Sequence, residues 1–120
     1  MHNFKELKVW KAGIDVSKKT FQLCRNFPPE EKYGLISQMV RAAISIPSNI
    51  AEGCGRKSNK ELHQFLNIAL GSSFELETQF IIAKEFGYIQ QETLDKICIQ
   101  LNDIQRMIYG LQKSLENSIK

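Results

Sequence analysis

Apolar residues recur at spacings of three and four along four stretches of the chain, which is the pattern of amphipathic helices. The first stretch runs from about Phe4 to Cys24, and the prolines at 28–29 stop it because proline cannot continue a helix. We expect this helix to face the core with a seam made of Leu7, Trp10, Ile14, Ser17, Phe21 and Cys24.

The second stretch runs from about Pro29 to Glu52 and contains an internal proline. Its helical period continues through Pro47, so we predict one proline-kinked helix rather than two elements. Proline has no backbone N–H, and the carbonyl of Ala43 should therefore lack its usual helical donor. Gly53 is well placed to end the helix in the left-handed conformation.

The third and fourth stretches complete an all-helical pattern. Ser58 and Glu61 match a capping box, so a third helix should start there and extend to about Phe86. A fourth should run from Gln90 to about Ser118. No stretch alternates at period two for long enough to indicate a strand. The chain is therefore predicted to be all-α: one domain over residues 1–120, folded as an antiparallel up-down-up-down four-helix bundle with a proline-kinked second helix.

The third helix is apolar on almost every side, beyond what one core requires. In so small a chain, the second apolar side is expected to meet another copy of the same protein. The candidate residues for this homo-oligomer interface are Ile68, Phe74, Ile82 and Phe86.

A compact polar arc lies opposite the apolar face of the second helix. We expect it to form a network with carboxylates of the third helix, either fixing helix register or a subunit contact, or binding a ligand or nucleic acid. The residues of this network are Gln38, Arg41, Ser45, Asn49, Glu52, Glu75 and Glu77.

Charge is distributed unevenly along the chain, although the net value is only +3. Residues 1–57 hold ten lysines and arginines against five acids, a net +5, whereas residues 58–120 hold six against eight, a net −2. A basic half can attract RNA or DNA, or it can be an ordinary solvated helix face. The candidates for phosphate contacts are Lys5, Lys8, Lys11, Lys18, Lys19, Arg25, Arg56 and Lys57.

No pattern in the sequence indicates catalysis or a cofactor. A di-iron bundle needs Glu-x-x-His pairs, but Lys60 stands three residues before His63. Neither a phosphate-binding loop nor a nucleophile–base set is visible, so we expect no metal, no catalytic residue and no enzyme. The odd count of three cysteines and the lack of a signal peptide or an 18-residue apolar run predict a cytoplasmic protein with no membrane contact.

Three segments together resemble a known family: FKELKVWKAG, NFPPEEKYGLISQMVRAAISIPSNIAEGCGR and ELHQFLNIALGSSFELETQ. They are similar to the four-helix bundle proteins encoded in intervening sequences of bacterial 23S ribosomal RNA genes. The resemblance spans nearly the whole chain, and RAAISIPSNIAEG is its most specific part. The positions that match the family pattern are Gln38, Arg41, Ser45, Pro47, Asn49, Glu52, Gly53, Arg56, Gly71, Ser72, Glu75 and Glu77.

The resemblance implies an up-down bundle that assembles as a ring-like homopentamer, and no catalytic residue comes with it. Distant relatives are accessory proteins of diversity-generating retroelements, which bind nucleic acid and a reverse transcriptase through a basic surface. This chain departs from them in being only mildly basic. The leading hypothesis is a non-enzymatic homo-oligomer that binds RNA or DNA. The alternative is a protein–protein scaffold or accessory subunit with no nucleic-acid binding, in which a protein partner docks on the basic rim.

Overall fold

Four helices make up most of the computed structural model, which describes residues 3–119 and contains no strand in that range. The all-helical prediction is confirmed. Two short 3₁₀ turns precede the first and second helices. In chain order the elements are η1 (Phe4–Glu6), α1 (Lys8–Cys24), η2 (Pro29–Glu31), α2 (Leu35–Cys54), α3 (Asn59–Glu85) and α4 (Gln91–Ile119).

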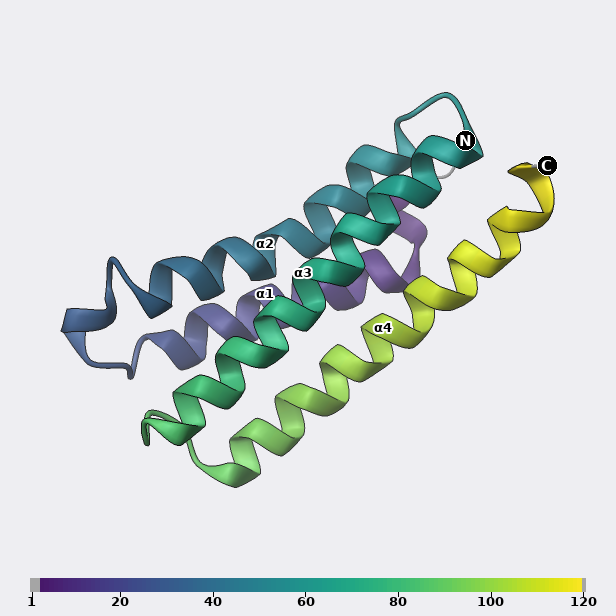
Figure 1. Cartoon of the computed structure of the whole chain (residues 1–120). Helices are drawn as coiled ribbons and strands as arrows, with labels where there is room; N and C mark the ends of the chain where they lie inside the picture. The colour runs from purple at the N-terminus through teal and green to yellow at the C-terminus, as the bar shows by residue number, and fades with distance from the viewer. Residues whose placement is uncertain (1–2, 120) are drawn as a thin grey trace.

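Neighbouring helices run antiparallel, because contacts that advance along one helix recede along the next. The beginning of α1 and the end of α4 accordingly lie at the same end of the bundle (Figure 1). The contact between α2 and α3 is the most extensive, and that between α1 and α4 is the least extensive. The hydrogen bonds and ion pairs that fix these registers are Ser17–Ala43, Arg41–Glu75, Ser45–Ser72, His63–Glu116, Asn67–Gln112 and Glu77–Gln105.

All four helices contribute to one apolar core. In α3 and α4, apolar residues at helical spacing are buried along most of each helix, with Phe80 and Ile104 fully inaccessible to solvent. The predicted seam of α1 is wrong in part: Ser17 and Cys24 are buried, but Phe21 is 43% exposed, and Trp10 and Ile14 are only half-buried. The residues of α1 that are buried are Val9, Gly13, Val16, Ser17, Thr20 and Cys24.

The rotation of α1 follows from a close approach to α2. A Cβ added at Gly13 would lie 3.2 Å from the Cβ and Cδ atoms of Pro47, which is tighter than ordinary contact, so the proline ring would have to shift by a few tenths of an ångström. The single O–H of Ser17 is shared between the carbonyl of Ala43, at 3.1 Å, and the carbonyl of Gly13 in its own helix, at 2.8 Å. The Ala43 carbonyl is the one left without its helical donor by Pro47, and a hydroxyl of the neighbouring helix takes the place of that donor.

The central proline does not interrupt α2, which is one continuous helix through Pro47, as the unbroken period predicted. Its ends differ from the prediction. Residues from Pro29 onward form a 3₁₀ turn before α2 begins at Leu35, because Gly34 between them has a non-helical backbone, with φ −113° and ψ −107°. Helix α1 likewise begins at Lys8 rather than Phe4, since Leu7 is extended.

The glycines near the ends of α2 and α3 have different roles. The left-handed role of Gly53 is wrong: within residues 3–119, Gly87 alone has a positive φ, at 81°. Gly53 is instead the place where α2 and α3 approach closely, and an added Cβ would lie 2.8 Å from the Cβ of Phe65. Gly87 ends α3, since the N–H of Tyr88 donates to the carbonyl of Ala83 in a Schellman arrangement.

Candidate functional site

Four lysines of α1 share its solvent-facing side. Lys8, Lys11, Lys18 and Lys19 are all exposed, and the helical period places them within about 100° of the circumference. Asp15 is the acidic residue in this arc. Among the residues that the structure describes, none of these four lysines forms an ion pair with a carboxylate. We refer to these four residues as the lysine face.

Two further predicted basic residues lie at the ends of α1. Lys5, in η1, is exposed and has its Nζ 5.9 Å from the ring centroid of Phe4. Arg25 follows the last residue of α1 at the opposite end of the bundle and is also exposed. The basic surface of α1 therefore extends over the length of the helix.

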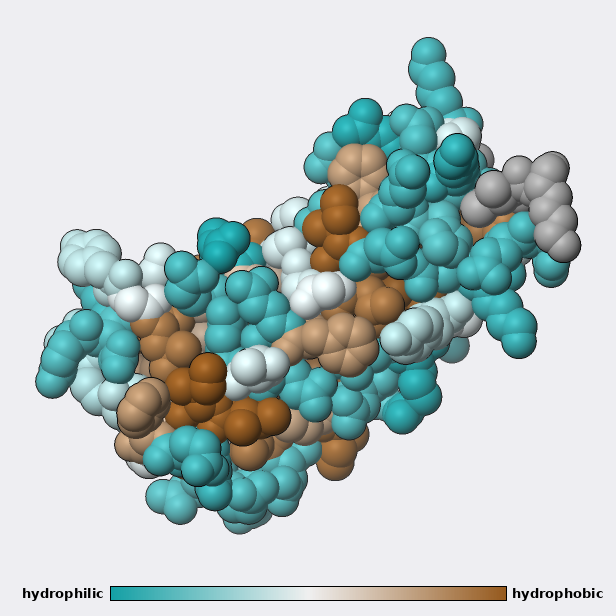
Figure 2. Space-filling model, in the orientation of Figure 1, coloured by the Kyte–Doolittle hydropathy of each residue, from teal (hydrophilic) through white to brown (hydrophobic). Residues whose placement is uncertain are grey.

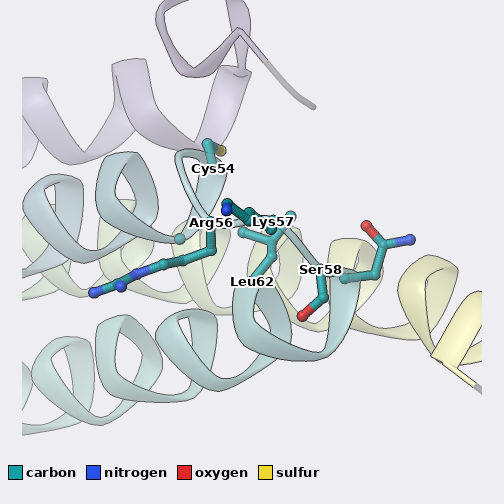
Figure 3. A pocket seen from close by; sticks show the side chains of 7 residues that line it. Cys54, Arg56, Lys57, Ser58 and Leu62 are labelled. Carbon is teal, nitrogen blue, oxygen red and sulfur yellow. The ribbon is translucent and has the colours of Figure 1, made fainter.

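The remaining two basic candidates lie in the turn between α2 and α3. Arg56 pairs with Glu52 at 2.7 Å, and its guanidinium lies 4.7 Å from the ring centroid of Phe65. In Figure 3 the Arg56 side chain extends away from Ser58, whose hydroxyl accepts the N–H of Glu61 and caps α3. Lys57 lines a pocket of about 80 Å³ at this turn. Arg56 is therefore committed to contacts within its own chain, unlike the lysine face.

The predicted polar network forms part of the seam between α2 and α3. The guanidinium of Arg41 donates a hydrogen bond to the side-chain oxygen of Gln38 at 2.7 Å, and it lies 3.8 Å from the carboxylate of Glu75. Ser45 and Asn49 form a second group: the Asn49 amide donates to the Ser45 hydroxyl at 2.9 Å, which is 2.8 Å from the hydroxyl of Ser72 on α3. These contacts fix the register of the two helices.

The structure places two predicted members of the network elsewhere. Glu52 pairs with Arg56, and Glu77 accepts from Gln105 of α4 at 2.9 Å. Sequence reasoning missed Gln79, which is 8% exposed and donates weakly to Glu75 at 3.5 Å. Its Oε1 is buried without a partner among the described residues. Its spacing from Ser72 and Glu75, at seven and four residues, was the signal in the sequence that pointed to it.

The four predicted interface residues are all exposed, and three of them share one face. Ile68, Ile82 and Phe86 are 50%, 39% and 65% exposed, and the helical period aligns them along α3. Glu75 falls in the same arc and pairs with Arg41, so this face lies on the α2 side of the bundle. Phe74 lies about 120° away around the helix. We refer to Ile68, Ile82 and Phe86 as the α3 ridge.

Apolar side chains gather over α3 on the face shown in Figure 2, most densely near the C-terminal end of the helix. Single exposed apolar residues are common on protein surfaces, but an aligned set on one helix is typical of an interface. The exposure of the α3 ridge is consistent with the predicted interface and does not test it.

A second apolar surface was missed by sequence reasoning. The outer side of α1 and α2 has two hollows, one of about 350 Å³ and one of about 290 Å³. Their principal lining residues are Trp10, Ile14 and Ile44 in the first, and Phe21, Ile36 and Val40 in the second. We refer to these six residues as the α1–α2 groove. The expected seam of α1 belongs largely to this surface rather than to the core.

Reactive groups are not gathered into a site. Among residues 3–119, no cluster of three His, Cys, Asp or Glu side chains is placed to hold a metal. Burial raises the pKa of the Cys24 thiol to about 11 and also raises the pKa of Cys54. Thiols with raised pKa values are poor nucleophiles at neutral pH. In the same range, no helix is both long and apolar enough to cross a membrane.

The fold and these surfaces define the class of the protein: an antiparallel four-helix bundle with a basic first helix and exposed apolar faces. The chain matches the family described as 23S rRNA-intervening sequence protein over residues 5–110, and it belongs to that family. The structure is similar to a crystal structure of a protein with unknown function from the S23 ribosomal protein family of Bacteroides thetaiotaomicron. That likeness has a TM-score of 0.81 at 24% identity, covers 88% of this chain and 95% of the other, and shows the fold. No curated protein matches the chain.

Proposed function

We propose that the protein is a non-enzymatic homo-oligomer that binds the phosphate backbone of RNA or DNA through the lysine face of α1. The observation that carries this proposal is the alignment of Lys8, Lys11, Lys18 and Lys19 on one exposed arc without ion pairs in the described chain. Unpaired ammonium groups can contact phosphates without first losing an internal partner. Such contacts position a nucleic acid and read no sequence.

Fluorescence anisotropy tests the proposal directly. A labelled structured RNA and a duplex DNA of equal length are titrated with the wild-type protein and with the triple variant Lys11→Gln, Lys18→Gln, Lys19→Gln. We expect the variant to bind both more weakly at about 50 mM salt, by at least tenfold, because three phosphate contacts are lost.

A matched control separates a local surface from general charge. The triple variant Lys60→Gln, Lys96→Gln, Lys113→Gln removes the same charge from exposed positions of α3 and α4. It should bind about as tightly as wild type. Equal weakening by both triple variants would refute the lysine face as the binding surface, and no binding by wild type at low salt would refute nucleic-acid binding.

A protein scaffold is the second candidate function, and the α1–α2 groove is the observation that favours it. The groove provides an apolar surface beside the basic helix, on which a protein could dock. If scaffolding is the function, wild-type protein should bind neither RNA nor DNA in the anisotropy assay at low salt.

A further inference from the structure

A row of basic residues runs along α1 beside the α1–α2 groove. Lys11, Lys18 and Arg25 are exposed and stand seven residues apart, so the helical period places them within about 40° of one another and about 10.5 Å apart along the axis. Within residues 3–119, none of the three forms an ion pair with a carboxylate. Asp15 lies on the side of this row that is away from the groove. We refer to Lys11, Lys18 and Arg25 as the basic row.

Each of the two hollows of the groove is bordered by an aromatic ring next to the basic row. Trp10 lines the hollow of about 350 Å³, and Phe21, which is 43% exposed, lines the hollow of about 290 Å³. Both volumes are near the lower limit for ligand pockets, about 300 Å³. Within residues 3–119, no residue lines both hollows, so the two are separate. Separate hollows suit single flat rings better than a partner helix, which needs one uninterrupted apolar groove.

We infer that a single-stranded nucleic acid lies along α1, with its phosphates on the basic row and unpaired bases in the two hollows. This inference rests on the phosphate binding proposed above and adds the class of nucleic acid that is bound. Proteins that hold single strands combine a basic track for the backbone with aromatic side chains on which bases stack. One base would stack on Phe21 beside Arg25, and another would stack on Trp10 beside Lys11.

The lining of the second hollow indicates how a base would be held there. Besides Phe21 and Arg25, its lining residues are Cys24, Ile36 and Val40. Arg25 is the one charged group in this lining among the described residues, and the other side chains offer apolar contact. Every base has an apolar face that can stack, whereas base identity is read through hydrogen bonds to base edges. The hollow should therefore accept any unpaired base with little preference for sequence.

The difference between a single strand and a duplex separates stacking from simple charge attraction. Duplex DNA carries phosphates at a higher density than a single strand, so phosphate contacts alone favour the duplex. The bases of a duplex are paired and stacked on one another, and they are not free to enter the hollows. Tighter binding of the single strand therefore requires a contact with the bases.

One labelled DNA strand of about 20 nucleotides, alone and annealed to its complement, tests the inference by fluorescence anisotropy at about 50 mM salt. Phe21→Leu keeps an apolar side chain and removes the flat ring, so the variant should fold, which far-UV circular dichroism will check. Phe74→Leu is the matched control, because Phe74 on α3 is also 43% exposed and lines neither hollow.

The inference predicts different results for the two DNA forms. Wild type and Phe74→Leu should bind the single strand more tightly than the duplex. Phe21→Leu should weaken single-strand binding by about fivefold or more, which is the lower end of the effect of one base–aromatic stack, and change duplex binding by less than about twofold. Unchanged single-strand binding by Phe21→Leu would overturn the inference, as would equal weakening for both forms or a wild-type preference for the duplex. A wild type that binds neither form would instead overturn the proposed phosphate binding itself.

Discussion

The carbonyl that Pro47 leaves without a helical donor gives the most specific prediction about how the bundle is held together. Ser17 donates its hydroxyl to that carbonyl, on Ala43, across the contact between α1 and α2. Ser17 is 9% exposed and Ala43 is fully buried, so this carbonyl has little access to water. Ser17→Ala therefore leaves a buried acceptor unpaired.

The cost can be worked out from this contact. A buried carbonyl without a donor costs about 1–3 kcal/mol. The second acceptor of the hydroxyl, the carbonyl of Gly13, keeps its own helical N–H donor and adds little. Ser17→Ala should therefore lower the free energy of unfolding by about 2 kcal/mol, which is a fall in Tm of about 8 °C for a domain of this size. Ser114→Ala, which removes an exposed hydroxyl that bonds only within α4, should change stability by less than about 0.5 kcal/mol.

A double-mutant cycle tests whether the proline is the reason. Pro47→Ala restores a backbone N–H at position 47, and this N–H can donate to the Ala43 carbonyl. In that background, Ser17→Ala should cost less than about 0.5 kcal/mol, which gives a coupling of about 1–2 kcal/mol. Urea unfolding at one fixed protein concentration is the assay, because any self-association would shift the apparent stability. An equal cost of Ser17→Ala in both backgrounds would refute the reasoning.

Three further predictions concern an exposed glycine, a buried glycine and a buried thiol. Gly110→Ala adds a carbon with no atom within 4 Å at an exposed helical site, and should raise the urea-unfolding free energy by about 0.5–1 kcal/mol; a loss would contradict that open surface. Gly53→Ala should lower it by about 1–3 kcal/mol because the added carbon meets Phe65, and a gain would contradict the close approach of α2 and α3. Burial raises the pKa of Cys24 from 9.0 to about 11, so the stability that this thiol contributes is complete below pH 9 and is lost as pH rises towards 11. Cys24→Ala should flatten the decline in Tm over that range, and an unchanged decline would contradict the assignment.

Periodicity predicted the fold because α4 carries one strong core stripe that no other stripe rivals, and because the capping box of Ser58 and Glu61 marks the start of α3. It failed at α1, where two stripes compete: a bulky one through Trp10 and Phe21, and a small one through Gly13 and Thr20. The small stripe is buried because Pro47 packs closely against Gly13 and because Ser17 donates to the Ala43 carbonyl, which Pro47 leaves without its helical donor. Which of the two stripes of α1 is buried depends on its contacts with α2, and the hydrophobic pattern of α1 alone carries no information about those contacts.

The candidate site shows the same division. The lysines of α1 could be assigned to one face from their spacing, and the structure places them there. The hydrogen-bonding partners of the carboxylates could not be predicted from spacing. Glu52 and Glu77 were expected to join the network between α2 and α3, but Glu52 pairs with Arg56 and Glu77 accepts from Gln105. The α1–α2 groove was not predicted because the wrong side of α1 was expected to face the core. Trp10, Ile14 and Phe21, which line the groove, were therefore assigned to the core.

The salt dependence of nucleic-acid binding is the most direct test of the central claim that the lysine face contacts phosphates. The slope of log K against log salt concentration is measured between about 50 and 200 mM for wild type and for the Lys11, Lys18 and Lys19 triple variant. Each phosphate contact contributes about 0.9 to the slope on duplex DNA and about 0.7 on single strands. The account predicts that the variant's slope is shallower by about 2–3. Equal slopes for the two proteins would contradict it.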